Sequence, residues 1–368
     1  DIFDYGTVVN FLIEFAIKIL FLPIVAGISY EVLKLLAKSQ SKILLPVKAP
    51  GFALQKLTTR EPSEDMLEVA IAAFKKVYEM DADPSVPETD FTVSKSVQKY
   101  TEELKTLFAE KGIDESDAEW LVAMKTGVAR SGLAESDKML VPSEVKELDA
   151  LAGERMAGKP LWYVLGSTSF YGYEIKTDAR ALIPRPETEM LAELAIKTAE
   201  DGNSVLDLCT GSGCIAVAVA NETKKQGKSV KVTASDISAD ALALAAENVK
   251  ANGAEVALVE SDLLSGIRGK FDVIVCNPPY IKRGDLSSLQ SEVRDYEPMS
   301  ALDGGEDGLD FYRRLAKDAP KKLKKGGTLL MECGQGQAQE IVKLFKKFDY
   351  AMITRDLEGV ERYIRAVL

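Results

Sequence analysis

Short apolar runs alternate with amphipathic stretches through the second half of the chain. The runs are rich in Val, Ile and Leu and cover residues 204–208, 231–235, 256–260, 271–276, 328–333, 351–356 and 362–367. Runs of this length and composition are typical of buried strands. Residues at helical spacing lie between them, in stretches that include 240–250, 310–323 and 337–348. The series predicts an α/β fold built on a seven-stranded, Rossmann-like sheet whose last two strands form a hairpin.

Helical spacing also dominates the region from about Ser94 to Leu165. Its apolar residues fall into three stripes, formed by Leu104, Leu107 and Phe108, by Ala118, Leu121, Val122 and Met124, and by Val145, Leu148, Leu151 and Met156. Ser143 is the expected N-cap of the third helix. The stripes predict a small helical domain over residues 90–166. We expect this domain to position a substrate; a merely stabilising appendage is the alternative.

The stretch after the helical region is predicted to join it to a sheet domain over residues 167–368. Two short strands, 170–176 and 181–183, are expected to form a hairpin. The sequence Ile183-Pro184-Arg185-Pro186-Glu187-Thr188-Glu189 then opens a helix, because Pro186 suits the first turn and the acids favour a helix N-terminus. The same residues are also compatible with a stiff wall beside a pocket.

Residues 1–83 form a separate segment. Val8–Tyr30 is strongly apolar and nearly long enough to span a membrane, although Glu14 and Lys18 interrupt it at helical spacing. A transmembrane helix, an interfacial helix and a packing helix all remain open, and with them membrane contact of residues 1–40.

A second helix is predicted closer to the end of this segment. Ser63 is expected to cap it, and an apolar stripe runs over Met66–Val77. Prolines and acids over residues 81–88 then predict a linker.

The composition removes several classes of function. The formal net charge of −11 argues against a broad basic face for nucleic acid, although a local patch would survive it. The chain has no histidine, which excludes His-based triads, HExxH zinc sites and a His general base. Four cysteines without CxxC spacing predict buried thiols in a reducing cytosol and no metal site. Because the chain begins with Asp and shows no signal peptide, we expect a fragment or a processed product.

The stretch Phe271–Ile281 combines a buried strand with an abrupt stop. After Cys276 comes the tetrapeptide Asn277-Pro278-Pro279-Tyr280. Two successive prolines cannot donate to a strand ladder, so the strand must end in a stiff loop. Open α/β sheets bind ligands at this end of their strands. Asn277 and the Pro278 carbonyl can accept both hydrogens of a planar NH2 group, and Tyr280 can cover its face. A plain strand-ending turn is the alternative.

A glycine loop follows the first strand of the sheet. The sequence Asp207-Leu208-Cys209-Thr210-Gly211-Ser212-Gly213-Cys214 leads into an Ala- and Val-rich helix, and its glycines allow a tight turn and close approach to a ligand. The loop lacks the third glycine and the spacing of the dinucleotide fingerprint. Asp236 ends the second strand, where an acid can hold both hydroxyls of a ribose. Asp262 and Leu263 follow the third strand, within reach of an adenine amino group. Four successive strands thus end in a polar residue, namely Asp207, Asp236, Asp262 and Asn277. Each of these alone is more often a turn or cap residue, but the four together indicate a nucleotide site.

Five motifs in a fixed order give the chain a resemblance to a known family. They are IPRPETE, DLCTGSGCIAVAVA, ASDIS, FDVIVCNPPYI and EVRDYEPMSALDGGEDGLDFYRRL. Over about residues 93–368 the sequence resembles the bacterial peptide chain release factor N5-glutamine methyltransferases. NPPY is shared with N6-adenine DNA and several RNA methyltransferases, whereas RPETE and the EPxxAL–GGEDGLDFYR block are far more specific. Residues of about 6–80 resemble the C-terminal end of a bacterial integral membrane family of unknown function, which would make the chain a fusion.

The resemblance implies a class I methyltransferase domain with S-adenosylmethionine as its cofactor. It implies cofactor contacts from Asp207, Cys209, Thr210, Gly211, Ser212, Gly213, Asp236, Asp262, Leu263 and Asn277. It implies that the acceptor is gripped by Asn277, Pro278, Pro279 and Tyr280, with Arg185, Pro186 and Glu187 as a wall that helps place the substrate. The implied substrate is the glutamine in the GGQ tripeptide of class 1 release factors, and we expect a cytoplasmic monomer that does not bind nucleic acid directly. One departure from the family pattern is Cys209, where Gly is usual.

Two alternatives from other classes of function remain at this point. A nucleic-acid N-methyltransferase would use the same NPPY tetrapeptide, but it needs a basic recognition face, which the net charge does not favour. A membrane-anchored module would be dominated by residues 1–80, with the enzyme half tethered at the inner membrane face or decayed. The change at Cys209 is the only sequence support for the second alternative.

Overall fold

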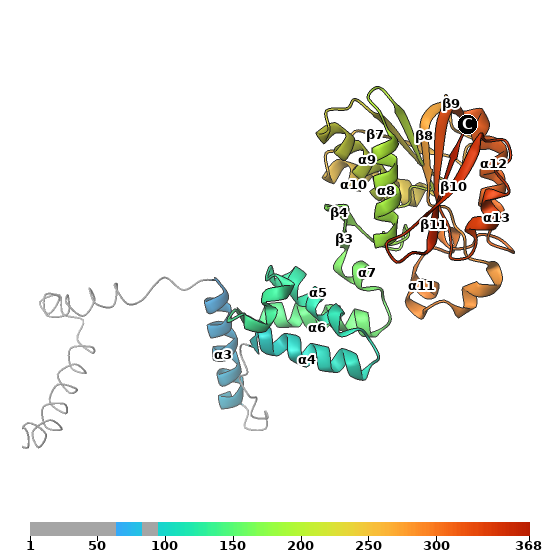
Figure 1. Cartoon of the computed structure of the whole chain (residues 1–368). Coiled ribbons are helices and arrows are strands. Elements are labelled where there is room, and N and C mark those ends of the chain that lie inside the picture. Colours follow the sequence, from blue (N-terminus) through green and yellow to red (C-terminus); the bar gives the residue numbers. More distant parts are fainter. Residues whose placement is uncertain (1–63, 83–94) are drawn as a thin grey trace, which may run out of the picture. The chain divides into compact units, whose positions relative to one another are not determined.

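The computed structural model describes residues 64–82 and 95–368. They belong to two units, Asp1–Phe91 and Thr92–Leu368, which are described separately (Figure 1). In the first unit, α3 Glu64–Ala82 confirms the helix expected around the Met66–Val77 stripe. The stripe is exposed along its length, at Met66, Leu67, Ile71, Phe74, Val77 and Tyr78.

Several expectations for the first unit fall on other residues. The expected cap Ser63 and the apolar segment Val8–Tyr30 lie outside the described residues. The helix α3 continues to Ala82, so the linker expected from residue 81 starts no earlier than residue 83. Among residues 64–82 and 95–368, no helix is both long enough and apolar enough to cross a membrane.

The second unit begins with a helical part that has an apolar core of its own. Its elements are β1 Lys95–Ser96, α4 Val97–Glu110, α5 Glu115–Thr126, the 3-10 helix η2 Arg130–Glu135, β2 Met139–Leu140, α6 Pro142–Met156 and α7 Leu161–Leu165. The stripe residues that the core buries are Leu104, Phe108, Ala118, Leu121, Val122 and Leu148. Leu107 and Met124 are exposed instead, because a step of one or two residues from a buried neighbour turns a side chain by about 100° or 200° around the helix.

The start of α6 differs from the expected cap. The N-cap is Val141 and not Ser143, and Pro142 occupies the first helical position. Proline suits that position because its φ is already helical and its missing N–H has no partner there. The Glu144 carboxylate accepts a hydrogen bond from the Val141 N–H at 3.0 Å.

A hairpin of β3 Ser167–Phe170 and β4 Tyr173–Lys176 follows the helical part. The run expected as one strand over residues 170–176 is divided, because Tyr171 and Gly172 take φ values of 52° and 80° and form a two-residue turn. The second expected strand, Ala181–Ile183, is wrong: these residues form a loop. Their backbone N–H groups are taken by a turn and by a side chain, which leaves no ladder to form.

The other seven strands form one sheet in the order β10-β11-β9-β8-β5-β6-β7, which confirms the expected α/β sheet. They are β5 Ser204–Leu208, β6 Lys231–Asp236, β7 Val256–Glu260, β8 Phe271–Cys276, β9 Leu323–Glu332, β10 Tyr350–Arg355 and β11 Glu361–Val367. Within this sheet β11 runs antiparallel to both of its neighbours. The winding reverses at β5, so the crevice of the topological switch point lies between the carboxyl ends of β5 and β8.

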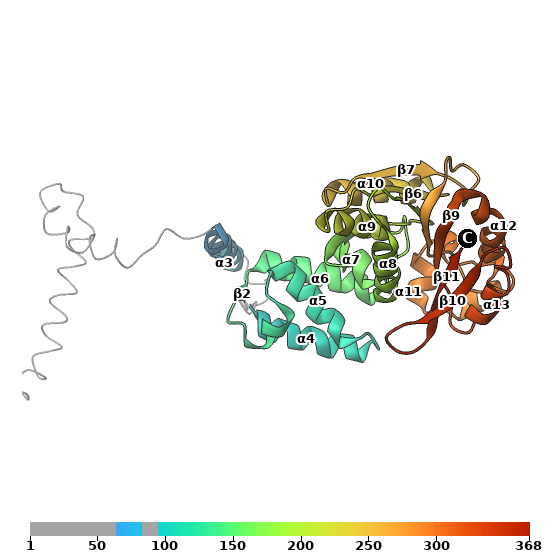
Figure 2. The same ribbon diagram turned by 45° about the horizontal axis from the view of Figure 1, so that its top comes forward.

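Helices cover both faces of the sheet (Figures 1 and 2). On one side lie α8 Pro186–Thr198, α9 Cys214–Lys225 and α10 Ala239–Ala251, and on the other lie α12 Asp310–Lys322 and α13 Ala338–Val342. Two apolar clusters fill the spaces between these helices and the sheet. The result is a three-layer sandwich whose rigid strands hold the switch point in place.

The helix α13 is shorter than the stretch expected over residues 337–348. The chain continues in turns after Val342, yet Phe345 and Phe348 are still buried. Their rings pack edge to face with centroids 5.2 Å apart. The apolar spacing that suggested a longer helix therefore reflects burial and not helical backbone.

Candidate active site

The glycine loop turns sharply at the carboxyl end of β5. Gly211 and Gly213 have φ values of 53° and 80°, and Gly213 directly precedes α9. A Cβ on Gly213 would lie 3.1 Å from the Cβ of Ala245, so the loop also packs tightly on α10. Cys209 has a left-handed backbone as well, with φ of 56°. Glycine adopts this conformation most easily, which explains why glycine is usual at this position of the motif.

Two acids support the loop in different ways. Asp207 is fully buried within β5 and accepts a hydrogen bond from the Thr210 hydroxyl at 2.6 Å. Burial raises the pKa of the Asp207 carboxyl to about 7, against the effect of that hydrogen bond. Asp236, at the end of β6, is partly exposed and accepts from the N–H groups of Gly211 at 2.9 Å and Ser238 at 3.0 Å. Asp207 therefore stabilises the loop from inside the sheet, whereas the Asp236 carboxylate is accessible to a ligand.

A cavity opens over the loop at the switch point. The residues expected at the site that line it are Arg185, Cys209, Thr210, Gly211, Ser212, Asp236, Asn277 and Pro279. A second cavity adjoins the first and shares Cys209, Asp236, Ser300 and Phe311 with it. Asp262 and Leu263 line this second cavity. The expected residues that line neither cavity are Asp207, Gly213, Pro186, Glu187, Pro278 and Tyr280.

The second cavity is bounded by an ion pair. The Arg314 guanidinium, from α12, lies 2.7 Å from the Asp262 carboxylate. Both residues line the cavity, and so does Phe311 one turn earlier in the helix. The lining of the second cavity thus combines a charged pair with an aromatic ring.

The Asn-Pro-Pro-Tyr turn stands at the opposite side of the switch point, after β8. Pro278 and Pro279 are buried, and Asn277 donates through Nδ2 to the Thr188 hydroxyl at 3.2 Å. The Tyr280 carbonyl accepts from the Gln337 amide at 2.9 Å. Burial raises the pKa of the Tyr280 phenol to about 12, so it stays protonated at neutral pH. The turn is therefore rigid as well as buried.

The acidic block is the sequence EPMSALDGGEDGLDFYR, which begins at Glu297 directly after α11 Ser291–Tyr296. It packs directly on this turn. The Ile281 N–H donates to the Leu302 carbonyl at 3.0 Å, and the Gly304 N–H donates to the Ile281 carbonyl at 2.8 Å. A Cβ on Gly304 would lie 2.7 Å from the Cα of Tyr280, so only glycine fits there without displacement. The GGEDGLDFYR part of the sequence thus clamps the Asn-Pro-Pro-Tyr turn from outside.

An ion pair ties the proline-rich wall to the same block. Glu297 is buried and accepts from the Arg185 guanidinium and, at 3.3 Å, from the Ile183 N–H. Burial raises the pKa of the Glu297 carboxyl, and the charge of Arg185 opposes the rise. Arg185 itself lines the first cavity, so its guanidinium is oriented beside the site.

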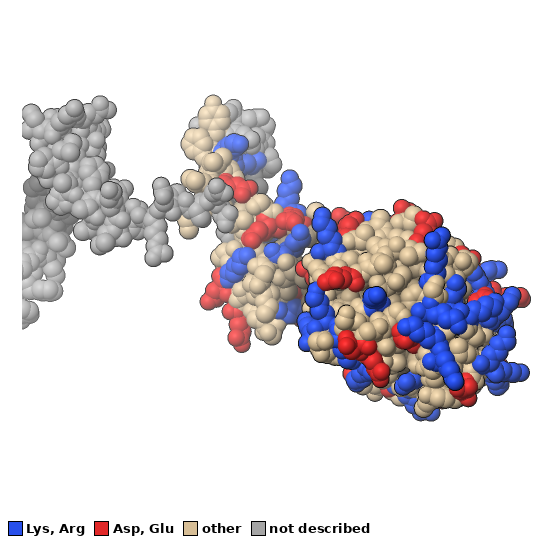
Figure 3. All heavy atoms as spheres, turned by 90° about the horizontal axis from the view of Figure 1, so that it is seen from above, with Lys and Arg blue, Asp and Glu red and all other residues tan. Residues whose placement is uncertain are grey.

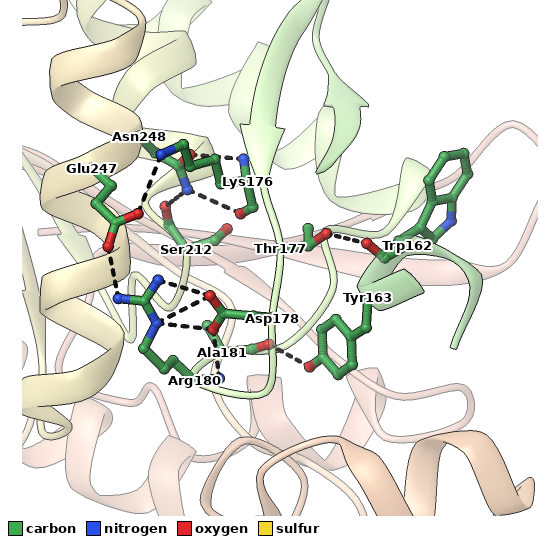
Figure 4. Close-up of polar contacts among 10 residues, drawn as sticks. All are labelled: Trp162, Tyr163, Lys176, Thr177, Asp178, Arg180, Ala181, Ser212, Glu247 and Asn248. Carbon is green, nitrogen blue, oxygen red and sulfur yellow. Dashed lines mark hydrogen bonds and ion pairs between the residues drawn. The ribbon is translucent and has the colours of Figure 1, made fainter. Parts of the chain in front are cut away.

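Figure 4 shows how the loop before this wall is fixed. Fully buried Asn248, from α10, accepts from the Lys176 N–H at 2.8 Å and donates to the Ser212 carbonyl at 2.8 Å. Arg180 pairs with Asp178 and with Glu247 of α10. Asn248 therefore joins the hairpin, α10 and the glycine loop in one network.

The helical part contributes to the same wall. The Tyr163 hydroxyl donates to the Ala181 carbonyl at 2.6 Å, and the Thr177 hydroxyl donates to the Trp162 carbonyl at 2.5 Å (Figure 4). These bonds fix α7 to the loop whose residues Ala181 and Ile183 line the first cavity.

Sequence reasoning missed four polar residues that organise the site: Thr188, Asn248, Glu297 and Glu332. One signal was present for Asn248, which occupies the apolar face of α10 seven residues after buried Ala241 and four after buried Leu244. A buried polar residue on an apolar stripe needs a partner. The other three lie in motifs whose partners are far away in the chain.

Three family models match separate parts of the chain. The family models "Protein of unknown function (DUF1385)", "PrmC N-terminal domain" and "Methyltransferase small domain" match residues 2–80, 100–166 and 186–292. The first match confirms that residues of about 6–80 resemble a separate family joined to the enzyme part. Membrane contact of residues 1–40 stays a prediction.

Full-length relatives cover the enzyme part. The release factor glutamine methyltransferase of Geobacter sulfurreducens is 39% identical over 275 residues, which are 73% of this chain and 95% of that protein. The protein of the same name from Chlorobaculum tepidum is 38% identical over 287 residues, 72% of this chain and 96% of that protein. Among solved structures, a methyltransferase from Pyrococcus furiosus matches 61% of this chain and 98% of that chain with a TM-score of 0.41 at 18% identity. At this identity to whole relatives, the chain belongs to the family of release factor glutamine methyltransferases.

Proposed function

We propose that the enzyme transfers a methyl group from S-adenosylmethionine to the side-chain amide nitrogen of the GGQ glutamine in class 1 release factors. One observation carries the proposal. Asn277 and Pro279, in a rigid turn after β8, line the same cavity as the glycine loop after β5. A cofactor above the loop and an acceptor against the turn would meet in that cavity.

The residues present fit S-adenosylmethionine. The two adjoining cavities together are lined by the glycine loop at Thr210 and Ser212 and by Asp262 after β7, so a nucleoside with an amino-acid arm would meet residues for both of its ends there. Asp236 would hold the ribose hydroxyls, because its two oxygens are oriented by backbone N–H groups and stay accessible. Cys209–Gly213 would lie along the methionine part, and Asp262 with Leu263 would border the adenine. Bound there, the sulfonium supplies an activated methyl group.

The protein's task is to place a poor nucleophile. An amide nitrogen shares its lone pair with the carbonyl, but it need not lose a proton before it attacks a sulfonium methyl group. The N–C bond would form as the S–C bond breaks, the thioether would leave, and the methylated nitrogen would then lose one proton to water. Asn277 Oδ1 and the Pro278 carbonyl would accept hydrogen bonds from the acceptor NH2 and raise its electron density as positive charge develops. Orientation alone supplies about 7–11 kcal/mol in favourable cases. A chain without histidine can therefore carry this reaction.

We propose that Tyr280 and Pro279 shape the acceptor site and that Arg185, Pro186 and Glu187 form its outer wall. Pro186 and Glu187 are exposed at the start of α8, where an incoming protein loop can reach them. We propose further that residues 90–166 position the release factor and that residues 167–368 carry the chemistry. The separate apolar core of the helical part supports this division.

A nucleic-acid methyltransferase with the same tetrapeptide is the second candidate. Figure 3 shows a face on which Lys and Arg side chains gather over part of the catalytic domain, so basic surface exists despite the net charge of −11. That face supports nucleic-acid contact, whereas the block that clamps the Tyr280 turn and the family of the chain favour a protein glutamine. We propose a monomeric enzyme in the cytoplasm, where release factors act, without direct contact with nucleic acid. Anchoring through residues 1–40 stays an open proposal.

The test is methyl transfer from labelled S-adenosylmethionine to purified release factor. Wild-type release factor and a variant with alanine in place of the GGQ glutamine are compared. Label on the wild type alone supports the reaction and the acceptor together. If neither release factor is labelled although calorimetry shows that the cofactor binds, the nucleic-acid methyltransferase is favoured instead. Failure to bind the cofactor would indicate a decayed site and direct attention to Cys209.

A further inference from the structure

Two buried side chains hold the Asn277 amide from behind. The Asn277 Nδ2 donates to the Thr188 hydroxyl at 3.2 Å, and that hydroxyl donates to the Glu332 carboxylate at 2.8 Å. Thr188 is 3% exposed and Glu332 is 1% exposed. Burial raises the pKa of the Glu332 carboxyl, and the nearby Thr188 hydroxyl and Asn277 amide oppose the rise. The three polar groups therefore form a connected chain of hydrogen bonds from Asn277 through Thr188 to Glu332.

The fold brings this cluster together from three segments. Cys276 pairs with Met331 in the neighbouring parallel strands β8 and β9, so Asn277 and Glu332 follow at adjacent strand ends. Thr188 comes from the first turn of α8, which packs on both strands. The Tyr312 hydroxyl donates to the Glu332 carbonyl at 2.8 Å and holds the end of β9. The position of Glu332 is thus fixed by its backbone as well as by its side chain.

The chemistry of the cluster decides which way the amide faces. In its ionised form Glu332 only accepts hydrogen bonds, and the Thr188 hydroxyl has one proton, which goes to Glu332. Thr188 can then only accept from Asn277, so the NH2 end of the amide must face inward. Oδ1, at the opposite end, is left for the cavity that Asn277 lines, and it receives no hydrogen bond from the described part of the chain.

We propose that Thr188 and Glu332 are positioning residues, which hold Asn277 with its carbonyl oxygen toward the acceptor nitrogen. The inference rests on the proposed function, since it explains how Asn277 is prepared for an NH2 group. A reversed amide would set a donor against a donor and lose the stabilisation that Oδ1 offers. The positioning role also explains why the RPETE motif contains Thr188, beyond its place at the start of a helix.

Thr188→Val removes the hydroxyl and keeps the shape of the side chain. We expect kcat for release factor methylation to fall about tenfold or more, because the acceptor is no longer aligned. The Kd for S-adenosylmethionine should change much less than kcat, since Thr188 lines the first cavity but makes no hydrogen bond to the glycine loop. Thr188→Ser, which restores the hydroxyl, should recover most of the rate. Glu332→Gln, which replaces the acceptor-only carboxylate form with an amide that also donates, should behave like Thr188→Val at a pH above about 7, where Glu332 is ionised.

The matched control is Thr223→Val. Thr223 is 1% exposed and donates to the Val219 carbonyl inside α9, away from Asn277. A purely structural role of Thr188 would lower the melting temperature and the rate together in both valine variants. If Thr188→Val keeps kcat within about twofold of the wild type, or if serine fails to restore it, the inference is overturned.

A measurement without the release factor separates this inference from the proposed function. In protein labelled with 15N-asparagine, the side-chain amide signals of Asn277 are identified by their loss in Asn277→Ser. We expect them to move in Thr188→Val and Glu332→Gln and to stay unchanged in Thr223→Val. Signals that stay in place in all variants would overturn the positioning role. Wild-type enzyme that binds the cofactor but labels no release factor would instead overturn the proposed function.

Discussion

The guanidinium of Arg185 is paired with the carboxylate of Glu297, although 112 residues separate them along the chain. Glu297 is almost wholly buried, whereas about a third of the Arg185 side chain is exposed (34%). The pair joins the proline-rich wall before α8 to the acidic block that follows α11. It therefore fixes one edge of the first cavity from two distant parts of the sequence.

Glu297→Gln should loosen this edge without unfolding it. The glutamine carbonyl can still accept from the Ile183 N–H, but the charge that orients Arg185 is lost. If the poorer orientation of Arg185 costs about 1 kcal/mol of transition-state stabilisation, kcat/KM for the release factor decreases about fivefold. Steady-state kinetics at saturating cofactor measure it. Lys343→Gln, which breaks the exposed Lys343–Glu340 pair, is the control and should change nothing. Equal kinetics for both variants would contradict the role of Arg185.

Asn277→Ala should lose most of the turnover. The Pro278 carbonyl would remain, but the acceptor would lose one of its two hydrogen bonds and its alignment, at a cost of about a hundredfold in kcat. Cofactor binding should weaken only partly, because the glycine loop and Asp236 are unchanged. Single-turnover rates and calorimetry separate the two effects. Turnover near that of the wild type would show that the acceptor is held elsewhere.

Gly304→Ala should destabilise the catalytic domain. The new Cβ would lie 2.7 Å from the Cα of Tyr280, and this backbone contact cannot move aside cheaply. We expect a loss of about 1–3 kcal/mol in the free energy of unfolding, visible as a lower melting temperature. The control is Gly284→Ala, whose Cβ would meet no atom within 4 Å. Similar melting temperatures for the two variants would contradict the close packing on the turn.

The stability of the enzyme should decrease as the pH rises toward neutrality. Burial raises the pKa of Glu332 to about 7 and that of Asp207 to about 7, while hydrogen bonds from Thr188 and Thr210 oppose the rise. Unfolded carboxyls titrate near pH 4 (about 3.9–4.3). Between the two values the folded protein holds more protons than the unfolded chain. The contribution of these groups is therefore complete below about pH 4 and is lost as the pH rises through about 7.

Variants with neutral side chains test this pH dependence. Asp207→Asn and Glu332→Gln should each flatten the fall of the unfolding free energy between about pH 5 and 8. Chemical denaturation across that range measures the slope. The nearby charges of Arg362 and Glu187 act on Glu332 in opposite directions and are unchanged in both variants. A slope that stays as steep as in the wild type would show that other groups carry it.

The sheet and the loops at the carboxyl ends of β5 and β8 could be predicted because their signals are local. The strands β5, β7 and β8 have the boundaries expected from their apolar runs. The Asn-Pro-Pro-Tyr turn and the glycine loop could be placed for the same reason, since prolines and glycines act on the backbone where they stand. The end of the helix predicted over residues 337–348 was less accurate. Phe345 is buried as the apolar spacing suggests, but it lies beyond the last residue of α13.

The supporting residues could not be predicted from local signals. Thr188 looks like a helix-start residue, and its role appears only when β9 brings Glu332 beside it from 144 residues away. Leu107 and Met124 were expected in a core, but the pattern allows either of two adjacent helix faces and packing selected the other. Such choices depend on which elements meet, and a single sequence does not specify that.

The late position of β9 in the chain has a consequence for synthesis. A growing chain that has emerged as far as α12 already contains the Asn-Pro-Pro-Tyr turn and the whole glycine loop, but it lacks Glu332. Until β9 emerges and inserts beside β8, the Asn277 amide has no carboxylate behind it, and one side of β8 has no hydrogen-bonded neighbour. The nascent polypeptide thus contains the glycine loop and the Asn-Pro-Pro-Tyr turn before it contains the carboxylate that lies behind them in the folded protein.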